Sequence, residues 1–330
     1  RPIEQMVDEY DLMVIDYPHV GEVSAKGLLQ NFDLEKYSNE LELLQKQSVG
    51  LSHQSYNIDG HQWALALDAA TQVSCYRNDL ITSHPKSWDD LFQLSKNNKV
   101  IWPLKPVHAI SSFYSIYNNI TEEFEPSNKN FIQKDFGVKT LQMMKQISQY
   151  LPSECFGMDP IKTAEILSEN NDFFYSPYTY GFSNYSRKGY RKNLLTYGNV
   201  IDLSGKGPCG THLGGTGIAI SNKSKNKELA LEYSYWIAGS ECQQTIFYTS
   251  GGQPGNSDAW ENNNINLETN NFFKNTRLTL DQAWIRPRHN GYMKFQDESG
   301  NIINEYLQSN VNEVNVIDKL KLMYAESFEE

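Results

Sequence analysis

The sequence predicts an α/β fold with mostly parallel sheets from one observation, and two further observations concern how the chain is divided into domains. Short apolar segments typical of buried strands alternate with segments whose apolar residues recur at helical spacing. At 330 residues, the chain is long enough for two domains that each have a core. It contains no internal repeat and no linker rich in Pro, Gly or Ser. If there are two domains, the chain must therefore cross between them within structured segments.

Five short apolar segments predict strands, because residues that end or turn the chain flank them. They are residues 10–16, 63–67, 71–77, 172–176 and 218–220. The first ends at Asp16, and its continuous apolar character favours a buried strand that leads into a ligand-side loop. The second follows the turn signal Asp59-Gly60, which predicts a hairpin, and the fourth ends at Pro177.

Helices are predicted where capping residues precede apolar residues at helical spacing. They cover residues 34–46, a segment that begins at Ser87, 138–151, 160–167, 225–238, a segment that begins at Ser240, 301–307 and 315–324. Asp159-Pro160 places a cap before a proline at the first helical position, and Ser240 opens a predicted capping box. In the helix 225–238, which Gly239 ends, the residues expected to be buried are Leu229, Tyr233, Trp236 and Ile237.

The charge balance argues against nucleic acid as the main partner. The chain has 29 basic and 40 acidic side chains, a formal net charge of −11, whereas phosphate binding needs clustered Lys and Arg. The basic stretches at 187–192 and 223–227 are interpreted as solvated loops, and residues 262–271, rich in Asn, predict a loose surface loop. No run of 18 apolar residues is present, so no segment predicts a membrane span.

The cysteines predict neither a metal site nor a defined disulfide. Cys75, Cys155, Cys209 and Cys242 lie far apart without a C-x-x-C pair, and their three possible pairings cannot be ranked. Cys209-Gly-Thr-His212 has half of a zinc motif but lacks the other half, so we expect no metal and no cofactor. No signal peptide is visible at Arg1, and we expect an upstream segment that was removed or not included.

The usual catalytic motifs do not occur in the chain. It contains no H-E-x-x-H, no phosphate-binding G-x-x-x-x-G-K-[ST] and no G-x-S-x-G. Gly215-Thr216-Gly217 begins like a dinucleotide fingerprint, but Ile220 replaces the third glycine and a strand follows instead of a helix. The seven scattered histidines leave a Ser/His/Asp triad open, although no turn presents a nucleophile.

Asp16 and Asp68 each follow a predicted strand, at the end of the sheet where ligands bind in open α/β folds. Two carboxylates facing a cleft can act as the acid and nucleophile of a glycosidase, or bind sugar hydroxyls without chemistry. Capping of a turn or helix is the third interpretation. The glycine clusters at 214–217 and 251–255 predict either turns or a ligand surface lined by backbone.

Residues 175–182, Tyr-Ser-Pro-Tyr-Thr-Tyr-Gly-Phe, are expected to form an exposed loop at a strand end. Exposed tyrosine rings are unfavourable without a partner, and a tyrosine can stack on the apolar face of a sugar. We expect at least one of these rings to contact a ligand, with ordinary core packing as the alternative.

Four segments, in order, resemble the extracellular solute-binding proteins of family 1, the receptor components of ABC importers. The strongest resemblance is residues 214–221, Gly-Gly-Thr-Gly-Ile-Ala-Ile-Ser, which lead into Ser-Lys-Asn-Lys-Glu-Leu-Ala at 224–230. The others are residues 10–21, residues 68–80 followed by Pro-Lys-Ser-Trp-Asp-Asp at 85–90, and residues 285–295. The resemblance covers nearly the whole chain and is close to a subgroup with GGTGxAxS, SGGQPG and AWxRPR-like segments.

The resemblance implies a periplasmic-binding-protein-like type II fold, with two interleaved α/β lobes and a hinge. Lobe one would hold residues 1–70 and 218–270, and lobe two residues 71–217 and 271–330, with crossings near 71–76, 215–218 and 270. Members of this family begin with a strand, a helix and a second strand before the segment that matches Arg1. That strand-helix-strand is therefore expected to be missing from this chain.

The resemblance also implies a receptor rather than an enzyme. It would capture a small polar solute, expected to be a carbohydrate, by closing the hinge, and deliver it to a membrane permease. The ligand-binding residues would be Asp16, Tyr17, His19, Asp68, Thr71, Tyr178, Tyr180, Gly215, Thr216, Arg286 and Arg288. If the two arginines face the cleft they favour an acidic sugar or another carboxylate, and surface or inter-lobe salt bridges are the alternative.

The expected partners are the small ligand and ABC permease subunits, with no nucleic acid, and the expected state is a monomer. The expected location is outside the cytoplasm, in a periplasm or lipid-anchored on the outer face of the membrane. Two other functions stay open: a glycoside-acting enzyme that uses Asp16 and Asp68, and the effector domain of a regulator.

Overall fold

The computed structural model describes residues 2–81, 83–121 and 132–329, which belong to two compact units. Unit 1 comprises Arg1–Ala70, Leu213–Leu267 and Arg288–Asn290, and unit 2 comprises Thr71–His212, Glu268–Pro287 and Gly291–Glu330. The chain thus passes between the units at five points, two of which enclose Arg288–Asn290. Within the described residues, no helix has both the length and the apolar character needed to cross a membrane.

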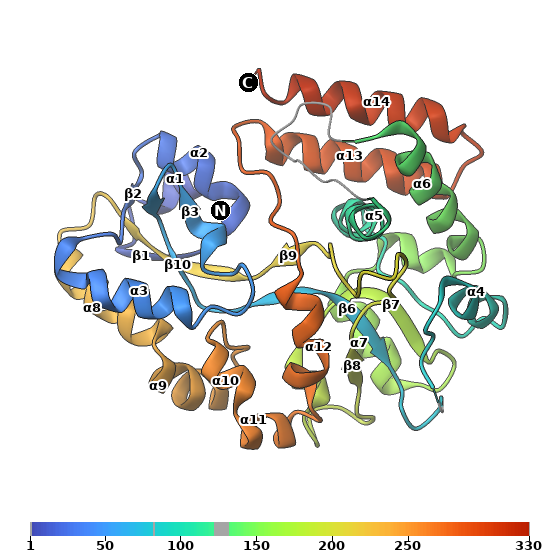
Figure 1. Ribbon diagram of the computed structural model, residues 1–330, viewed down its shortest axis with the longest axis horizontal. Coiled ribbons are helices and arrows are strands. Elements are labelled where there is room, and N and C mark those ends of the chain that lie inside the picture. The colour runs from blue at the N-terminus through green and yellow to red at the C-terminus, as the bar shows by residue number, and fades with distance from the viewer. Residues whose placement is uncertain (1, 82, 122–131, 330) are drawn as a thin grey trace. The chain divides into compact units, whose positions relative to one another are not determined.

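The sheet of unit 1 is organised around a single strand, β10 (Figure 1). It contains β1 (Leu12–Asp16), β2 (Leu29–Gln30), β5 (Leu65–Ala66) and β10 (Thr216–Ser221). β10 pairs antiparallel with each of the other three, so the predicted parallel pairing is wrong here. β1 and β2 run parallel to each other, as a strand–helix–strand connection requires, but β10 lies between them because it enters from a distant part of the chain.

The remaining elements of unit 1 lie outside this sheet. They are α1 (Ile3–Met6), α2 (Val20–Ala25), α3 (Ser38–Lys46), β3 (Asn57–Ile58), β4 (His61–Gln62), β9 (Leu213–Gly214), α8 (Lys227–Ala238), α9 (Ser240–Cys242), a π-helical turn (Gln243–Phe247), α10 (Ser257–Glu261) and α11 (Asn263–Glu268). The predicted hairpin is confirmed: Asp59 and Gly60, with φ of 54° and 81°, connect β3 to β4. α11 occupies most of the segment expected to be a loose loop, so that expectation is wrong.

α8 buries a different face from the predicted one. Leu229, Tyr233 and Trp236 are 67%, 41% and 47% exposed, and the buried residues of the helix are Ala230, Leu231, Ser234, Tyr235 and Ala238. Tyr235 selects this face, because its hydroxyl donates a 2.7 Å hydrogen bond to the Phe32 carbonyl inside the unit 1 core. The predicted capping box at Ser240 is also absent, since the Ser240 hydroxyl donates to Asp258 instead.

Unit 2 combines antiparallel strands with helices. Its elements are β6 (Ala70–Tyr76), α4 (Trp88–Lys96), α5 (Pro106–Ile120), α6 (Lys134–Ser148), α7 (Pro160–Glu169), β7 (Tyr175–Tyr180), β8 (Thr196–Gly198), α12 (Phe272–Asp281), α13 (Tyr292–Leu307) and α14 (Glu313–Glu326). β6 pairs antiparallel with both β7 and β8. The caps at Ser87 and Asp159 are confirmed, because both side chains accept hydrogen bonds from the first turns of α4 and α7.

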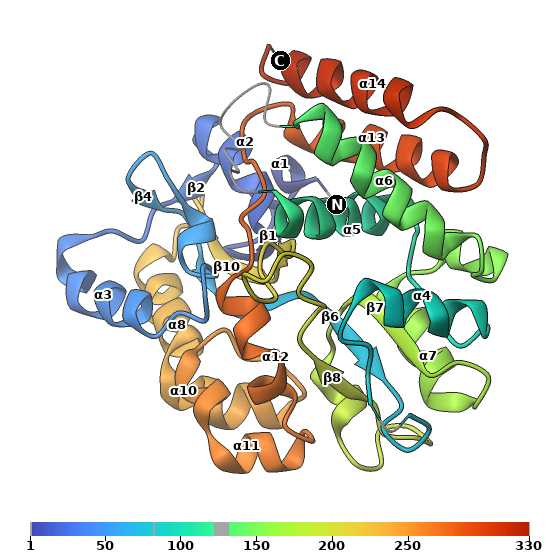
Figure 2. The same cartoon turned by 45° about the vertical axis from the view of Figure 1, so that its right-hand side comes forward.

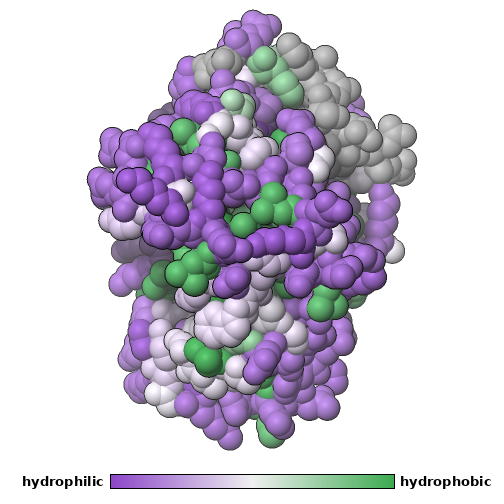
Figure 3. Space-filling model, turned by 90° about the vertical axis from the view of Figure 1, so that its left-hand side faces the viewer, coloured by the Kyte–Doolittle hydropathy of each residue, from purple (hydrophilic) through white to green (hydrophobic). Residues whose placement is uncertain are grey.

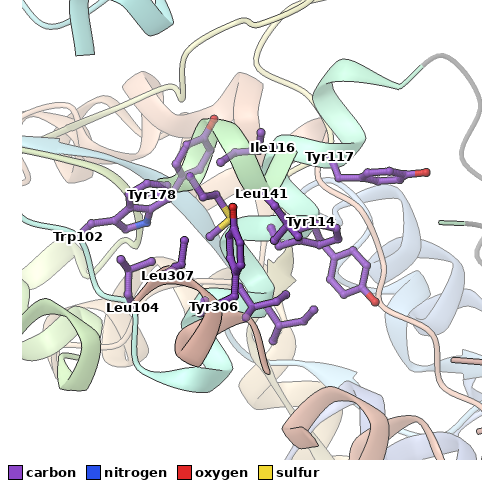
Figure 4. Packing of buried hydrophobic residues seen from close by; sticks show 14 of the residues in the cluster. Trp102, Leu104, Tyr114, Ile116, Tyr117, Leu141, Tyr178, Tyr306 and Leu307 are labelled. Carbon is purple, nitrogen blue, oxygen red and sulfur yellow. The ribbon is translucent and has the colours of Figure 1, made fainter. Parts of the chain in front are cut away.

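α5 escaped prediction because residues 109–119 are buried around its whole circumference, which leaves no amphipathic pattern. It packs with α6 and α13, and α14 packs on α6 and α13 (Figure 2). Figure 4 shows part of this core, where Trp102 stacks on Tyr178 with ring centroids 5.7 Å apart. The segment 175–180 is thus a buried strand, so the expectation of an exposed aromatic loop is wrong.

Gly300 tests how tightly α13 packs on α5. A Cβ at this position would lie 2.5 Å from the Pro106 carbonyl oxygen and 2.7 Å from its carbon, and backbone cannot easily move away. We expect Gly300→Ala to lower the free energy of unfolding by about 1–3 kcal/mol, measured by urea denaturation, despite the better helix propensity of alanine.

Gly157→Ala is the matched control, because no atom lies within 4 Å of its added Cβ. We expect the control to unfold at or slightly above the wild-type urea midpoint. A Gly300→Ala variant as stable as the control would contradict the described packing.

Candidate functional site

In unit 1, Asp68 is fixed against the first residue of β10. Its Oδ1 accepts a 2.6 Å hydrogen bond from the Thr216 backbone N–H, and its Oδ2 accepts a 3.0 Å bond from the Thr216 hydroxyl. The Thr216 carbonyl in turn accepts from the N–H groups of Leu67 and Asp68. The Asp68 carboxylate therefore has a defined orientation at the end of the sheet.

Gly215 permits this close approach of two backbone segments. Its φ is +107°, and a Cβ there would lie 2.7 Å from the Asp68 carbonyl oxygen. Any other residue would be strained as well as sterically excluded, so the glycine is explained by the geometry of the Asp68 loop.

A second carboxylate, Asp16, lies close to the first. Asp16 is opposite Thr216 in the β1–β10 register, and its charge acts on Asp68. Burial, and to a smaller degree Asp16, raise the pKa of Asp68 to about 6, against the opposing hydrogen bonds from Thr216. We call Asp16, Asp68, Gly215 and Thr216 the Asp68 cluster; its carboxylates can only accept hydrogen bonds when ionised.

Three other predicted residues of unit 1, Tyr17, His19 and Arg288, are not part of the Asp68 cluster. Tyr17 is fully buried, and its hydroxyl donates to the Leu213 carbonyl at 2.9 Å. His19 lies near Glu4, whose pKa is lowered mainly by a hydrogen bond from Lys26 and slightly by His19.

Arg288 acts as an anchor for its own segment. Its Nη1 donates to the backbone carbonyls of Ser55 and Asn57 at 2.8 and 2.9 Å, and to that of Gln54 at 3.3 Å. A Cβ on Gly21 would lie 1.7 Å from the Arg288 carbonyl oxygen, so Gly21 makes room for the same segment.

In unit 2, the buried His212 is surrounded by polar and aromatic groups. His212 Nδ1 lies 2.9 Å from the Tyr180 hydroxyl, and its backbone N–H donates to the Ser115 hydroxyl at 3.0 Å. Its ring packs near those of Tyr114 and Trp284, at centroid distances of 6.0 and 5.9 Å. Within the described residues, Nε2 is buried and has no hydrogen-bond partner.

Charge and burial keep this histidine neutral. Burial above all, and then the nearby Arg286 and His108, lower the pKa of His212 well below its ordinary value. Burial likewise lowers the pKa of His108 to about 4. A neutral imidazole can use Nε2 as a donor or an acceptor, according to its tautomer. We call His108, Tyr180, His212, Trp284 and Arg286 the His212 cluster.

The other predicted residues of unit 2 serve its interior. The Thr71 hydroxyl bonds to the Thr211 hydroxyl at 2.8 Å and lies 3.1 Å from the His212 carbonyl. Tyr178 is 1% exposed and stacks on Trp102. Arg286 is 5% exposed, and its Nη1 donates to Gln296 at 3.2 Å.

Sequence reasoning missed His108, His212 and Trp284 as candidate site residues. His212 was considered only as half of a zinc motif, although it directly precedes the glycine segment, and Trp284 belongs to the AWxRPR-like segment that contains Arg286. The described parts of the chain contain no group of three His, Cys, Asp or Glu that could hold a metal ion, and the four cysteines are free thiols.

Comparison with known proteins identifies the fold and the family. The model of a family described as bacterial extracellular solute-binding protein matches residues 4–272. Comparison with curated protein sequences found no match.

Similar solved structures have the same fold at low sequence identity. Maltose-bound MalE3 of Thermotoga maritima has a TM-score of 0.81 and 15% identity, over 96% of this chain and 84% of that chain. A solute-binding protein of Agrobacterium radiobacter K84 in complex with ribitol has a TM-score of 0.80 and 18% identity, over 99% of this chain and 86% of that chain. A solute-binding protein of Thermotoga lettingae bound with α-D-tagatose has a TM-score of 0.78 and 14% identity, over 98% of this chain and 86% of that chain. The fold is therefore the periplasmic-binding-protein type II fold.

The raised pKa of Asp68 predicts a dependence of stability on pH. The unfolded chain ionises this group near pH 3.8 and the folded chain near pH 6, so the group costs stability as pH rises from about 4 to 6, and the full cost persists above 6. Asp68→Asn keeps an oxygen for the Thr216 N–H but does not titrate. Its stability relative to wild type should therefore rise by up to about 3 kcal/mol between pH 4 and pH 7.5.

Urea denaturation at the two pH values measures this difference. Asp297→Asn, which removes the same charge from an exposed position on α13, is the control and should show little change. Equal behaviour of the two variants would refute the burial of the Asp68 carboxylate.

Proposed function

The chain belongs to the bacterial extracellular solute-binding proteins, and we propose that it is the ABC-importer receptor for a neutral, polyhydroxylated solute, with carbohydrates as the leading class. The observation that carries the ligand class is the Asp68 cluster, in which one carboxylate ends β1 and the other follows β5, the strands that pair with the two sides of β10. Hydroxyl groups donate hydrogen bonds that carboxylates accept, and each such bond to a charged group is worth about 1.5–3 kcal/mol.

Electrostatics disfavour an anionic ligand at this cluster. Asp16 already raises the pKa of Asp68, so a further negative charge would be repelled. In unit 2, the neutral His212 offers Nε2 to a hydroxyl, which can both donate and accept. The solutes named for the three similar structures, maltose, ribitol and α-D-tagatose, are all polyhydroxylated, which supports the same class.

An acidic sugar is the second candidate, and Arg286 is the observation that favours it. Arg286 is buried in the His212 cluster and could bind a carboxylate. Arg288 contributes less to this alternative, because its Nη1 already bonds to three backbone carbonyls.

The wider role follows from the family. We propose a monomeric receptor at the outer face of the cell membrane that binds its solute by hinge closure and delivers it to ABC permease subunits. The matched family and structures are binding receptors, not enzymes, which argues against the glycosidase alternative. Tyr17, His19, Thr71, Tyr178 and Arg288 stay predictions as ligand contacts. The described contacts of Tyr17, Thr71, Tyr178 and Arg288 support structural roles.

A thermal-shift screen tests the ligand class. We expect a neutral mono- or oligosaccharide or polyol to raise the melting temperature, because a ligand at 100 times its Kd adds about 2.7 kcal/mol of stability. Sugar acids and amino acids should have little effect.

A rise in melting temperature with sugar acids alone would show that the ligand is an acidic sugar instead of a neutral one. If no sugar or sugar acid raised the melting temperature, both candidate ligand classes would be excluded. Chromatography of the same incubations distinguishes binding from catalysis, since a cleaved glycan would revive the enzyme that uses Asp16 and Asp68.

Titration of the best ligand at pH 7.5 and pH 5 tests the role of Asp68. Affinity should fall as pH drops through about 6, because the protonated carboxyl accepts hydrogen bonds less well. Asp68→Asn should weaken binding about tenfold or more at pH 7.5 and remove most of the pH dependence. Calorimetry measures both, with Asp297→Asn as control; unchanged affinity in Asp68→Asn would exclude Asp68 from the site.

A further inference from the structure

The outward face of α8 forms one wall of an open pocket in unit 1. The cavity has a volume of about 330 Å³, within the range of small-molecule sites. α8 contributes Tyr233, Trp236 and Ile237, the π-helical turn contributes Ile246 and Phe247, and Ser250 also lines the cavity. None of these residues belongs to the Asp68 cluster or the His212 cluster.

Large side chains stay exposed around this pocket. Trp236 is 47% exposed and Tyr233 41%, and their rings lie 5.5 Å apart at 45° to each other. Ile246, from the π-helical turn, is 56% exposed. Figure 3 shows this side of unit 1, where pale and green atoms interrupt the hydrophilic surface. A cluster of exposed rings and aliphatic groups marks a binding surface more often than scattered ones do.

The part of the pocket formed by the π-helical turn is held in shape by specific contacts. The π-helical turn Gln243–Phe247 is a rare conformation that is frequent at functional sites. The buried Gln243 side chain accepts a 2.8 Å hydrogen bond from the Gly255 N–H. A Cβ on Gly252 would lie 2.4 Å from the Phe247 ring, so this glycine lets the chain close over that ring. The pocket is therefore built into the fold rather than left by a loose loop.

The lining specifies a neutral ligand with both apolar and hydroxyl surfaces. It contains no charged side chain, so an ionic ligand would lose hydration without gaining a counter-charge. The lining also contains three hydrogen-bonding groups, the Tyr233 hydroxyl, the Trp236 indole N–H and the Ser250 hydroxyl. A hydrocarbon ligand would cover these groups without satisfying them. A sugar ring presents an apolar face to stack on Trp236 and hydroxyls to meet the polar groups.

We propose that this pocket, the α8 pocket, is a second binding site that takes one ring of a neutral oligosaccharide, with Trp236 as the stacking surface. The site is separate from the solute site of the proposed function and does not depend on it. It would let the protein contact a glycan chain while the transported solute is bound elsewhere.

Fluorine NMR of protein labelled with 5-fluorotryptophan tests the proposal at the residue itself. The chain has six tryptophans, and Trp236→Phe assigns the resonance of Trp236. The probes are maltotetraose, cellotetraose, xylotetraose and chitotetraose. We expect the Trp236 resonance to shift in a saturable way with at least one of them.

Two variants make the result specific. Tyr233→Ala should weaken the response at Trp236 about tenfold or more, since one of the two rings is lost. Leu267→Ala removes an apolar side chain of unit 1 that is more exposed, at 81%, and lies outside the pocket, and it should leave the response unchanged. Because all three side chains are exposed, the variants should keep the wild-type urea midpoint.

A Trp236 resonance that stays fixed with all four probes would overturn the proposal. So would a shift caused by neutral phospholipid vesicles or by protein concentration alone, which would assign the pocket to a membrane or to a second copy. Thermal shifts by the transported solute report on the other site and should be the same in Trp236→Phe as in wild type, so the two proposals can fail independently.

Discussion

Unit 1 depends on the backbone pairing of β10 with three other strands. Thr216 begins this strand, and its N–H, hydroxyl and carbonyl groups together fix the Asp68 loop. Gly217 follows, where a Cβ would lie 2.6 Å from the Tyr56 ring, so the strand can pack against that ring only through a glycine. The same strand thus completes the sheet and sets the position of the carboxylate that we assign to ligand binding.

Burial shifts the pKa of one residue in each cluster, in opposite directions. It raises the pKa of Asp68 and lowers that of His212, so each environment disfavours the charged form. Near neutral pH, Asp68 is still ionised because its pKa is about 6, whereas His212 is uncharged. One cluster then accepts hydrogen bonds and the other provides an uncharged nitrogen that can accept or donate. A hydroxyl group can both donate and accept, so it suits the chemistry of each cluster, which is why we propose a hydroxyl-rich solute.

α8 shows why the sequence predicted only part of the surface. The helix carries two apolar stripes, and its sequence does not say which one faces the core. The hydrogen bond from Tyr235 to Phe32 buries one stripe, and Tyr233 and Trp236 are then left on the outside. Two of the three misassigned side chains, Tyr233 and Trp236, line the α8 pocket, so the orientation of α8 accounts both for the error in burial and for this wall of the proposed second site.

Local chemistry in the sequence determined the hairpin at Asp59-Gly60, the caps at Ser87 and Asp159, and the strands around Asp16 and Thr216. These features depend on φ angles and hydrogen bonds among residues a few positions apart, and a single sequence contains that information. The tertiary structure alone decided that residues 175–180 are a buried strand, that β10 separates β1 from β2, and that His212 is neutral. Burial and strand order depend on segments that meet from distant parts of the chain, and local pattern does not specify those meetings.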